Sequence, residues 1–431
     1  MDKLVIEGGR RLEGTVTISG AKNACLPILA ATLLSDEKSV IRNIPSLRDI
    51  ATMLKILKNF GARVVQDGDV IIVEPKGYTK YTAPYELVST MRASICVLGP
   101  LLAKHKKAEV SFPGGCIIGP RPIDIHLKGL TALNAKLKVE RGYIIADGSK
   151  MRGAHIYLGG HFGSSVLATA NVMMAATLTK GVTIIENAAC EPEVMDLSTF
   201  LVKMGARIKG YGSHRIIIEG VKKLHGADHS VIPDRIEAGT LMCAAAITKG
   251  EVLVRGVHLP HVESTLIKLK QAGVEVLEEE SGVRIKAPLR LRATDIKTQP
   301  FPGFPTDMQS QLVSLLSLAE GTSVVTESVF ENRFMHVHEL KRMGADIRLE
   351  GSSAIITGVP RLQGAPVKAR DLRAGAALMI AGMAAEGETL IEDIDRFIER
   401  GYDKLDQKLR GLGADIRELK NIAEYEEETD Q

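Results

Sequence analysis

A Gly-Ala step or a close variant lies between a helix pattern and a strand pattern at six places along the chain. The intervals between successive steps are 73, 71, 68, 71 and 69 residues. The steps are Gly61-Ala62-Arg63, Asn134-Ala135-Lys136, Gly205-Ala206-Arg207, Gly273-Val274-Glu275, Gly344-Ala345-Asp346 and Gly413-Ala414-Asp415. Such regular spacing over 431 residues indicates six copies of a unit of about 70 residues.

The fifth copy shows the order of elements in the unit most clearly. Asp307 precedes an apolar helix face that Gly321 ends, and residues 323–326 have the pattern of a strand. A second helix pattern ends at Met343, and two strand patterns flank the turn at Gly351. Because strands alternate with helices and the unit is longer than common solenoid repeats, we expect an α/β protein with helices packed on sheets and not a superhelical array. The length of the chain favours two domains.

Charge and composition limit the classes of ligand. The net charge is +3, and an acidic tail from about residue 421 leaves the rest of the chain more basic, which suits anionic small substrates. The chain has no Trp, only 4% aromatic residues and no basic run with interleaved aromatic residues, so we expect no nucleic acid partner. No apolar run is long enough to span a bilayer, so we expect no membrane insertion and a cytoplasmic location.

The five cysteines are widely spaced and form neither a disulfide framework nor a metal-ligand pattern. We therefore expect no metal site, and no cofactor motif is recognised. Cys25, Cys96 and Cys243 lie in helix patterns rich in alanine and leucine, which favours buried and unreactive thiols.

The first helix of each unit starts on a charged residue in five of the six copies. The residues at these starts are Lys22, Arg92, Arg235, Asp307 and Arg373, and the third copy has Ser164-Ser165. A helix N-terminus already favours anions, so a cation there suggests a negative ligand close by. Any one of these cations also fits a solvated helix start. Four of them at equivalent places favour an anion-binding centre, provided that the helix starts converge.

Residues 113–124 form a loop rich in glycine and proline that contains Cys116 and Arg121. Glycine permits unusual backbone angles, proline stiffens the flanks, and a nearby guanidinium stabilises a thiolate. The pattern indicates a movable loop with a reactive thiol. A surface turn with an incidental thiol is the alternative.

Six segments carry a longer pattern: Ser19–Asn23, Pro113–Asp124, Pro233–Glu237, Phe304–Gln309, Glu331–His336 and Arg400–Tyr402. In this order they resemble the UDP-N-acetylglucosamine 1-carboxyvinyltransferase family of enolpyruvyl transferases, and the resemblance extends to about residue 420. It implies a two-domain inside-out α/β barrel with three repeats per domain and with helix N-termini facing the cleft between the domains. One domain would contain residues 22–231, and the other residues 1–21 with 232–431.

The resemblance implies an addition–elimination reaction that transfers the enolpyruvyl group of phosphoenolpyruvate to the 3-hydroxyl of UDP-N-acetylglucosamine and releases phosphate. Cys116 corresponds to the general acid, with a covalent adduct as an alternative role, and Asp307 to a sugar-contacting carboxylate that could act as base. An aspartate at a helix start also fits a simple cap. The cations that correspond to the phosphoenolpyruvate clamp of the family are Lys22, Arg121 and Arg400. The cations that would line the same cleft are Arg92, Arg333 and Arg373.

Further positions match the family's contacts with the nucleotide sugar. They are Asn23, Arg92, Arg121, Pro122, Ile123, Asp124, Ile125, Ser165, Val166, Asp307 and Val329. One segment departs from the family pattern, because Leu167 stands where a glycine is common and no lysine lies near the expected diphosphate position. His161 is a candidate replacement for that lysine, and an exposed histidine without function is the alternative.

The reaction implied is the first committed step of peptidoglycan precursor synthesis, which would connect the chain to cell wall biogenesis, cell shape, the cell cycle and cell division. One alternative is a sister transferase that acts on shikimate 3-phosphate, against which the Pro-Gly-Gly-Cys loop and the segment Arg121–Asp124 argue. Another is a non-catalytic or RNA-end-binding protein built on related repeats. The sequence does not determine the oligomeric state.

Overall fold

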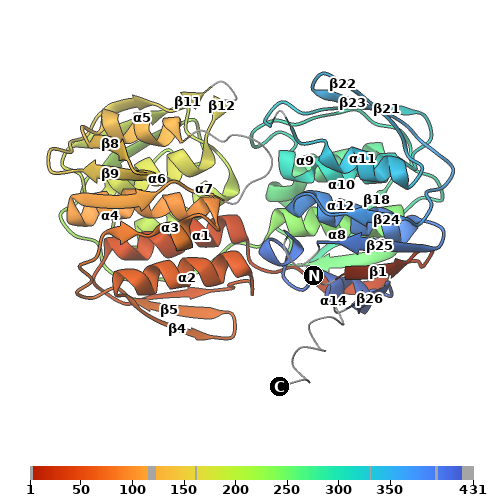
Figure 1. The fold of residues 1–431 in the computed structure, drawn as a ribbon, viewed down its shortest axis with the longest axis horizontal. Coiled ribbons are helices and arrows are strands. Elements are labelled where there is room, and N and C mark those ends of the chain that lie inside the picture. The colour runs from red at the N-terminus through yellow and green to blue at the C-terminus, as the bar shows by residue number, and fades with distance from the viewer. Residues whose placement is uncertain (1–2, 115–122, 161–162, 331, 394–396, 420–431) are drawn as a thin grey trace. The chain divides into compact units, whose positions relative to one another are not determined.

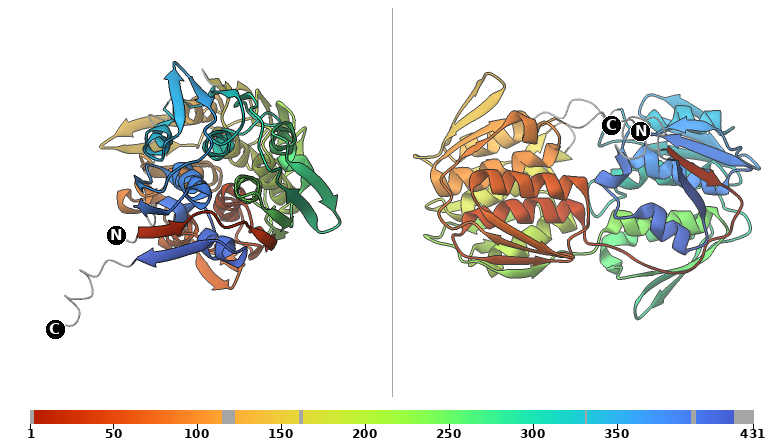
Figure 2. Two further views of the ribbon diagram at one scale, coloured as in Figure 1. Left: turned by 90° about the vertical axis from the view of Figure 1, so that its right-hand side faces the viewer. Right: turned by 60° about the horizontal axis from the view of Figure 1, so that its bottom comes forward.

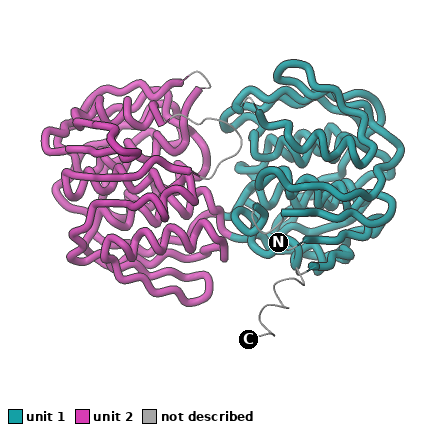
Figure 3. The backbone as a smooth tube through the Cα atoms, in the orientation of Figure 1, with its two compact units in different colours: residues 1–19, 117–119, 233–431 teal, residues 20–116, 120–232 magenta. Residues whose placement is uncertain are grey.

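The computed structural model describes residues 3–114, 123–160, 163–330, 332–393 and 397–419. The chain forms two compact units (Figure 3). Of the described residues, unit 1 contains 3–19 and 233–419, and unit 2 contains 20–114 and 123–232. Among the described residues we find no helix with the length and apolar character needed to cross a membrane.

Each unit contains three copies of the repeat, and among the described residues five of the six copies have the predicted order of helix, strand, helix and hairpin (Figure 1). In unit 2 the first copy contains α1 (Lys22–Ala31), η1 (Thr32–Leu34), β3 (Ser39–Arg42), α2 (Arg48–Phe60), β4 (Arg63–Asp67) and β5 (Val70–Glu74). The second contains β6 (Thr82–Ala83), α3 (Tyr85–Val88), η2 (Arg92–Val97), α4 (Leu98–His105), β7 (Lys107–Ser111), α5 (Asp124–Ala132), β8 (Lys136–Glu140) and β9 (Tyr143–Asp147). The third contains β10 (His155–Tyr157), β11 (Gly159–Gly160), β12 (Gly163–Ser164), α6 (Val166–Thr177), β13 (Val182–Glu186), α7 (Pro192–Lys203), β14 (Arg207–Lys209), β15 (Arg215–Glu219) and β16 (Asp228–Ser230).

Unit 1 repeats the same order, except that the last copy ends in a single strand, β26, and β1 (Lys3–Glu7) takes the place of the second hairpin strand. Its first copy contains α8 (Arg235–Ile247), β17 (Glu251–Arg255), α9 (Leu259–Gln271), β18 (Glu275–Glu279) and β19 (Gly282–Lys286). The next contains β20 (Ile296–Lys297), η3 (Thr306–Met308), α10 (Gln309–Leu316), β21 (Thr322–Thr326), α11 (Met335–Arg342), β22 (Asp346–Glu350) and β23 (Ser353–Thr357). The last contains β24 (Pro366–Lys368), α12 (Leu372–Ala384), β25 (Glu388–Glu392), η4 (Ile398–Arg400), α14 (Leu405–Gly411) and β26 (Asp415–Leu419).

Each repeat contributes to a four-stranded mixed sheet. In the sheet β20-β21-β23-β22, the short strand β20 pairs parallel with β21, while β21 and β23 pair antiparallel with Ser323 opposite Ile356. Strands of two or three residues such as β20 carry no readable alternation, and for this reason the sequence did not predict the parallel strand of the unit.

Segments distant in sequence complete three of the sheets. The N-terminal strands β1 (Lys3–Glu7) and β2 (Glu13–Thr17) both belong to unit 1, where β1 lies between β25 and β26 and β2 pairs parallel with β17. Figure 2 shows β1 beside the last strand of the chain. In unit 2, β16 pairs parallel with β3 of the first copy. These pairings bring residues 3–17 into the same unit as residues 233–419.

The six Gly-Ala steps are the C-terminal ends of the second helices. Each glycine or asparagine of the step has a positive φ, between 68° for Asn134 and 108° for Gly61. At each step the following residue donates its N–H to the carbonyl of a leucine five residues earlier, as Ala345 does to Leu340 at 3.1 Å. This is the Schellman arrangement, which needs a left-handed residue and therefore selects glycine or asparagine. The repeat signature is thus a helix-ending signal present six times.

The first helices of the repeats form the centre of each unit. In unit 1, α8, α10 and α12 pack against one another, and nearly every side chain of α8 and α12 is buried. Residues Leu372–Ala384 contain two glycines and many alanines, which let neighbouring helices approach closely. The second helices are amphipathic: in α2, Ile50, Met53 and Leu57 are buried and Lys55 is exposed.

Candidate functional site

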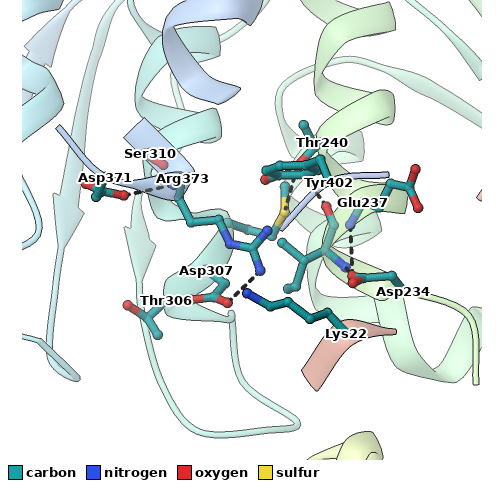
Figure 4. A network of polar contacts seen from close by, with 12 residues as sticks. Lys22, Asp234, Glu237, Thr240, Thr306, Asp307, Ser310, Asp371, Arg373 and Tyr402 are labelled. Carbon is teal, nitrogen blue, oxygen red and sulfur yellow. Dashed lines mark hydrogen bonds and ion pairs between the residues drawn. The ribbon is translucent and has the colours of Figure 1, made fainter. Parts of the chain in front are cut away.

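Asp307 and two predicted arginines, Arg333 and Arg373, form a largely buried ion-pair cluster in unit 1. Figure 4 shows Asp307 and Arg373. Nη2 of Arg333 donates to Oδ1 of Asp307 at 2.6 Å, and Nη2 of Arg373 donates to Oδ2 at 2.9 Å. Asp307 lies in η3, directly before α10, and Arg373 lies in the first turn of α12. The starts of two central helices of unit 1 therefore converge, which is the condition that the anion-binding interpretation required.

The electrostatics of the cluster favour an ionised Asp307. The side chains of Arg333 and Arg373 are both only 3% exposed, and that of Asp307 is 26% exposed. Burial alone would raise the pKa of Asp307, but the guanidiniums of Arg373 and Arg333 hold that pKa well below its usual range. Asp307 in this arrangement is an anion and only a weak base.

Both arginines have further donors that face no acceptor among the described residues. Nε and Nη1 of Arg373 are buried without a hydrogen-bond partner there, and so is Nε of Arg333. Nη1 of Arg333 donates to Oγ1 of Thr306 at 2.8 Å. Buried donors without acceptors are costly, and those of a guanidinium match carboxylate or phosphate oxygens. The cluster can therefore bind an anion in addition to Asp307.

Aspartates cap two of the helices that start near a cation. Oδ1 of Asp234 accepts hydrogen bonds from the backbone N–H groups of Ile236 and Glu237, next to Arg235. Oδ1 of Asp371 accepts the backbone N–H groups of Arg373 and Ala374 in the same way. The protein thus supplies an anion at these two starts, so a cation at a helix start does not by itself require a negative ligand. The unpartnered donors of Arg373 are therefore a stronger indication of anion binding than the position of a cation at a helix start.

Glu327 shapes the loop that contains Val329. Glu327 is 3% exposed, and its carboxylate accepts the N–H groups of Val329 at 2.7 Å and Phe330 at 3.1 Å. It also accepts the hydroxyl of Thr306 at 2.8 Å, and Thr306 in turn contacts Arg333. Glu327 therefore connects the Val329 loop to the ion-pair cluster. The sequence analysis did not select Glu327, because no pattern in the sequence distinguishes it from an exposed strand-end carboxylate.

Arg400 is the last residue of η4 and is followed by a glycine in close contact with α12. A Cβ atom on Gly401 would lie 2.4 Å from Cδ2 and 2.5 Å from Cδ1 of Leu372. Glycine at this position lets the chain between Arg400 and Tyr402 pass directly beside the start of α12. The ring of Tyr402 lies against Arg373, with 5.0 Å between Cζ and the ring centroid.

In unit 2, Lys22 and Asn23 are the first two residues of α1. Lys22 is 8% exposed, and its Nζ lies 3.4 Å from Oδ2 of Asp49, which is 6% exposed and belongs to the first turn of α2. Arg92 begins η2. The sequence analysis identified both cations but not Asp49.

The predicted sugar contacts of unit 2 that the structure describes also lie at helix starts. Ile123 is the N-cap residue of α5, Asp124 is exposed in its first turn, and Ile125 is half-buried. Ser165 is the N-cap residue of α6, and its hydroxyl accepts the N–H of Ala168 at 3.4 Å. Val166 begins α6, and the next residue, Leu167, packs partly against the core of unit 2.

Cys116, Arg121, Pro122 and His161 lie outside the described residues, so their predicted roles stay predictions. The prediction of buried thiols is confirmed for Cys25, Cys96 and Cys243, which are 0% exposed. Burial raises the pKa of Cys96 to about 12 and raises the pKa values of the other two. These three thiols are therefore protonated and unreactive at neutral pH.

The sequence is similar to that of known proteins over nearly the full chain. The family model described as EPSP synthase (3-phosphoshikimate 1-carboxyvinyltransferase) matches residues 6–409. A relative from Caldanaerobacter subterraneus subsp. tengcongensis, named UDP-N-acetylglucosamine 1-carboxyvinyltransferase 1, is 55% identical over 96% of this chain and 99% of its own length. A relative from Geobacter metallireducens, named UDP-N-acetylglucosamine 1-carboxyvinyltransferase, is 52% identical over 97% of this chain and 100% of its own length.

Solved structures share the fold. The enolpyruvyl transferase NikO from Streptomyces tendae superposes with a TM-score of 0.87 at 25% identity, covering 97% of this chain and 98% of its own. EPSP synthase from Acinetobacter baumannii superposes with a TM-score of 0.75 at 18% identity, covering 97% of this chain and 100% of its own. At that identity the second likeness concerns the fold alone.

Proposed function

The chain belongs to the EPSP synthase family of enolpyruvyl transferases, and on this premise we propose that it transfers the enolpyruvyl group of phosphoenolpyruvate to the 3-hydroxyl of UDP-N-acetylglucosamine with release of phosphate. The observation that carries the proposal is the identity of 55%, over nearly the whole chain, to a relative whose name states this acceptor. The enzyme is a carboxyvinyl transferase.

The second candidate acceptor is 3-phosphoshikimate, which the description of the family model states. Two findings favour the nucleotide sugar instead. The relatives named for UDP-N-acetylglucosamine are 50% to 55% identical to this chain, whereas EPSP synthase from Acinetobacter baumannii is 18% identical. The segment Arg121–Asp124 also resembles the nucleotide-sugar contacts of that family.

We assign Asp307 the role of base for the sugar hydroxyl. With both arginines bound to its carboxylate the pKa of Asp307 is too low for efficient proton abstraction. Anionic groups of the substrates would accept hydrogen bonds from the unpartnered donors of Arg373 and Arg333. This would weaken both ion pairs with Asp307 and so raise the pKa of Asp307. The sugar oxygen would then attack C2 of phosphoenolpyruvate, its proton passing to Asp307 while the methylene carbon receives a proton. In the elimination step the resulting methyl group would return a proton to the group that had protonated it, while the bond between C2 and the phosphate oxygen breaks. Phosphate would leave, the C=C bond would form again, and the product would be the enol ether of the sugar.

The remaining roles are proposed from the family resemblance. We assign the protonation of the methylene carbon to Cys116, and the binding of phosphoenolpyruvate to Lys22, Arg121 and Arg400. Contacts with the nucleotide sugar are assigned to Asn23, Arg92, Arg121, Pro122, Ile123, Asp124, Ile125, Ser165, Val166 and Val329. Units 2 and 1 would correspond to the two three-repeat domains of the family.

The reaction would start peptidoglycan precursor synthesis in the cytoplasm and so contribute to cell wall biogenesis, cell shape, the cell cycle and cell division. This cellular placement is proposed from the family resemblance and from the names of the relatives.

A phosphate-release assay tests the proposal. The purified chain is incubated with phosphoenolpyruvate and either UDP-N-acetylglucosamine, shikimate 3-phosphate or no acceptor. We expect phosphate release with the nucleotide sugar only, together with a product whose mass shows the added carboxyvinyl group. Release with shikimate 3-phosphate would identify the second candidate, and release with neither acceptor would contradict transferase activity.

A further inference from the structure

Three buried side chains without an assigned role form a hydrogen-bonded cluster beside the ion pairs of unit 1. Nε2 of Gln311 lies 3.0 Å from Oγ1 of Thr240 and 3.0 Å from the hydroxyl of Tyr402. The two hydroxyls are themselves 3.0 Å apart (Figure 4 shows Thr240 and Tyr402). All three residues are at most 2% exposed. A buried polar cluster of this kind is stable only when its members satisfy one another, so it specifies one arrangement.

The three residues come from the three repeats of unit 1. Thr240 belongs to α8, Gln311 to α10, and Tyr402 to the segment between η4 and α14. A change in the relative position of any two of these elements would break at least one hydrogen bond of the cluster. The cluster therefore fixes the three repeats to one another at the ends where their charged residues lie.

The direction of the hydrogen bonds follows from the available acceptors. The hydroxyl of Thr240 donates to the carbonyl of Ile236 at 2.8 Å, so its oxygen is left to accept from Tyr402 and from Gln311. The hydroxyl of Tyr402 donates to Thr240 and accepts from Gln311. This pattern requires a neutral phenol, and burial raises the pKa of Tyr402 accordingly.

The cluster contacts the ion pairs at two points. The amide nitrogen Nε2 of Gln311 carries two hydrogens. One N–H donates to the backbone carbonyl of Asp307 at 3.0 Å, one helical turn earlier, and the other is shared between the hydroxyls of Thr240 and Tyr402. The ring of Tyr402 packs against one face of the guanidinium of Arg373, and Cζ of Arg373 lies 5.0 Å from the ring centroid. A cation held against an aromatic face in a buried site has few other orientations. The orientation of Arg373 then determines where its unpartnered Nε and Nη1 donors point.

We propose that Tyr402, Gln311 and Thr240 are positioning residues of the transferase, with Tyr402 orienting Arg373 toward the anionic substrate and Gln311 holding the backbone of Asp307. This inference rests on the proposed function. None of the three is assigned contact with the reacting atoms. Their effect is transmitted through Arg373 and Asp307.

The first experiment separates the ring of Tyr402 from its hydroxyl. Tyr402→Leu removes the support of Arg373, and we expect the KM for phosphoenolpyruvate or for UDP-N-acetylglucosamine to rise by about 10-fold to 30-fold. Tyr402→Phe keeps the ring, so both KM values should stay within about threefold of wild type. Tyr78→Phe is the matched control. Tyr78 is a buried tyrosine of unit 2, and its hydroxyl donates to the carbonyl of Leu33 at 2.9 Å. A purely structural role would lower the active fraction in both Tyr402 variants and leave both KM values unchanged, which would overturn the proposal.

The second experiment tests whether Tyr402 acts through Arg373. Arg373→Lys keeps the positive charge but removes the planar fork that the ring supports. In this background Tyr402→Leu should add little further loss of kcat/KM, whereas independent roles would give losses that multiply. Multiplying losses would overturn the proposal.

Gln311→Met supplies a test that does not depend on the folding of the Tyr402 variants. It retains a side chain of similar length and removes the donor to Asp307, Thr240 and Tyr402. We expect a lower kcat and a shifted acidic limb of the pH–rate profile, since Asp307 titrates there under the proposed function. An unchanged profile with an unchanged kcat would overturn the assignment of Gln311. Inactivity of the wild-type enzyme with UDP-N-acetylglucosamine would instead contradict the proposed function itself.

Discussion

Nη2 of Arg373 donates to Oδ2 of Asp307 across 2.9 Å and so joins the starts of helices from two different repeats. On the other side, Arg333 donates to Oδ1 at 2.6 Å. One carboxylate thus neutralises part of the charge of two guanidiniums that are each 3% exposed. The proposed base, Asp307, is thus ion-paired with the proposed anion-binding groups, Arg333 and Arg373. A change in the charge of either side alters the ionisation or the orientation of the other.

Replacing Asp307 should therefore affect both activity and stability. We expect Asp307→Asn to lower kcat by about 100-fold or more, because an amide cannot accept the hydroxyl proton. It should also lower the free energy of unfolding by about 1–3 kcal/mol, because two buried guanidiniums lose their counter-ion. Phosphate release and urea unfolding followed by circular dichroism measure the two effects. Asp346→Asn changes an exposed carboxylate of the same unit and serves as control. A kcat within about twofold of wild type would contradict the assignment of Asp307 as base.

The close approach at Gly401 predicts a site-specific packing defect. In Gly401→Ala the new methyl group would lie 2.4 Å from Cδ2 of Leu372, so the start of α12 or the segment around Tyr402 has to move. We expect a loss of about 1–3 kcal/mol in the free energy of unfolding, with a lower kcat/KM because Arg373 follows Leu372 directly. The double variant Gly401→Ala with Leu372→Ala restores the space and should recover part of the activity. Equal activity of single variant and wild type would show that the contact does not constrain the site.

Buried Glu237 predicts a pH dependence of stability. Burial raises its pKa to about 7 although Lys408 forms an ion pair with its carboxylate, whereas a glutamate in the unfolded chain ionises near its ordinary value. The folded protein therefore binds this proton more strongly. Its stabilising effect is fully present below the unfolded pKa and is lost as the pH rises through about 7, at up to about 1.4 kcal/mol per pH unit.

The measurement is the urea midpoint at pH 5 and at pH 7.5. Wild type should lose more stability between these two values than Glu237→Gln, in which the titrating group is absent. Glu280→Gln removes an exposed carboxylate of the same unit and should keep the wild-type difference. A Glu237→Gln variant with the same pH dependence as wild type would contradict a raised pKa of Glu237.

The same substitution, Gly to Ala, should have opposite effects at Gly344, which follows the end of a helix, and at Gly411, which belongs to a helix. Gly344 has φ +91° and a Cβ there would meet nothing within 4 Å, so Gly344→Ala tests backbone strain alone and should cost about 1–2 kcal/mol. Gly411 is the last residue of α14 with equally open space and no positive φ, and Gly411→Ala should stabilise by about 0.5–1 kcal/mol because alanine restricts the unfolded chain. Thermal unfolding of both variants checks the signs. A stable Gly344→Ala variant would mean that the left-handed conformation is not required.

Much of the fold could be predicted because its signals are local. The helix-ending glycine of the fifth repeat and the turn at Gly351 depend on residues within one or two turns of each other, and both occur where the sequence indicated. The short strands β6, β20 and β24 were missed, because two or three residues have no measurable alternation. Of the site residues missed, Gln311 lies one helical turn after Asp307 and Tyr402 lies two residues after Arg400. Their spacing was a usable signal, but their burial was not visible.

The sequence alone determined the six repeats, the charged helix starts and the family resemblance, since each depends on the order of residue types along the chain. The tertiary structure decided which charges meet. Asp307 could have been a simple helix cap, and it became the shared partner of Arg333 and Arg373 only because α10, α12 and the loop before α11 converge. The physical reason is that the ionisation of a carboxylate depends on the charges and solvent within a few ångströms. That environment is set by residues 26 and 66 positions away along the chain.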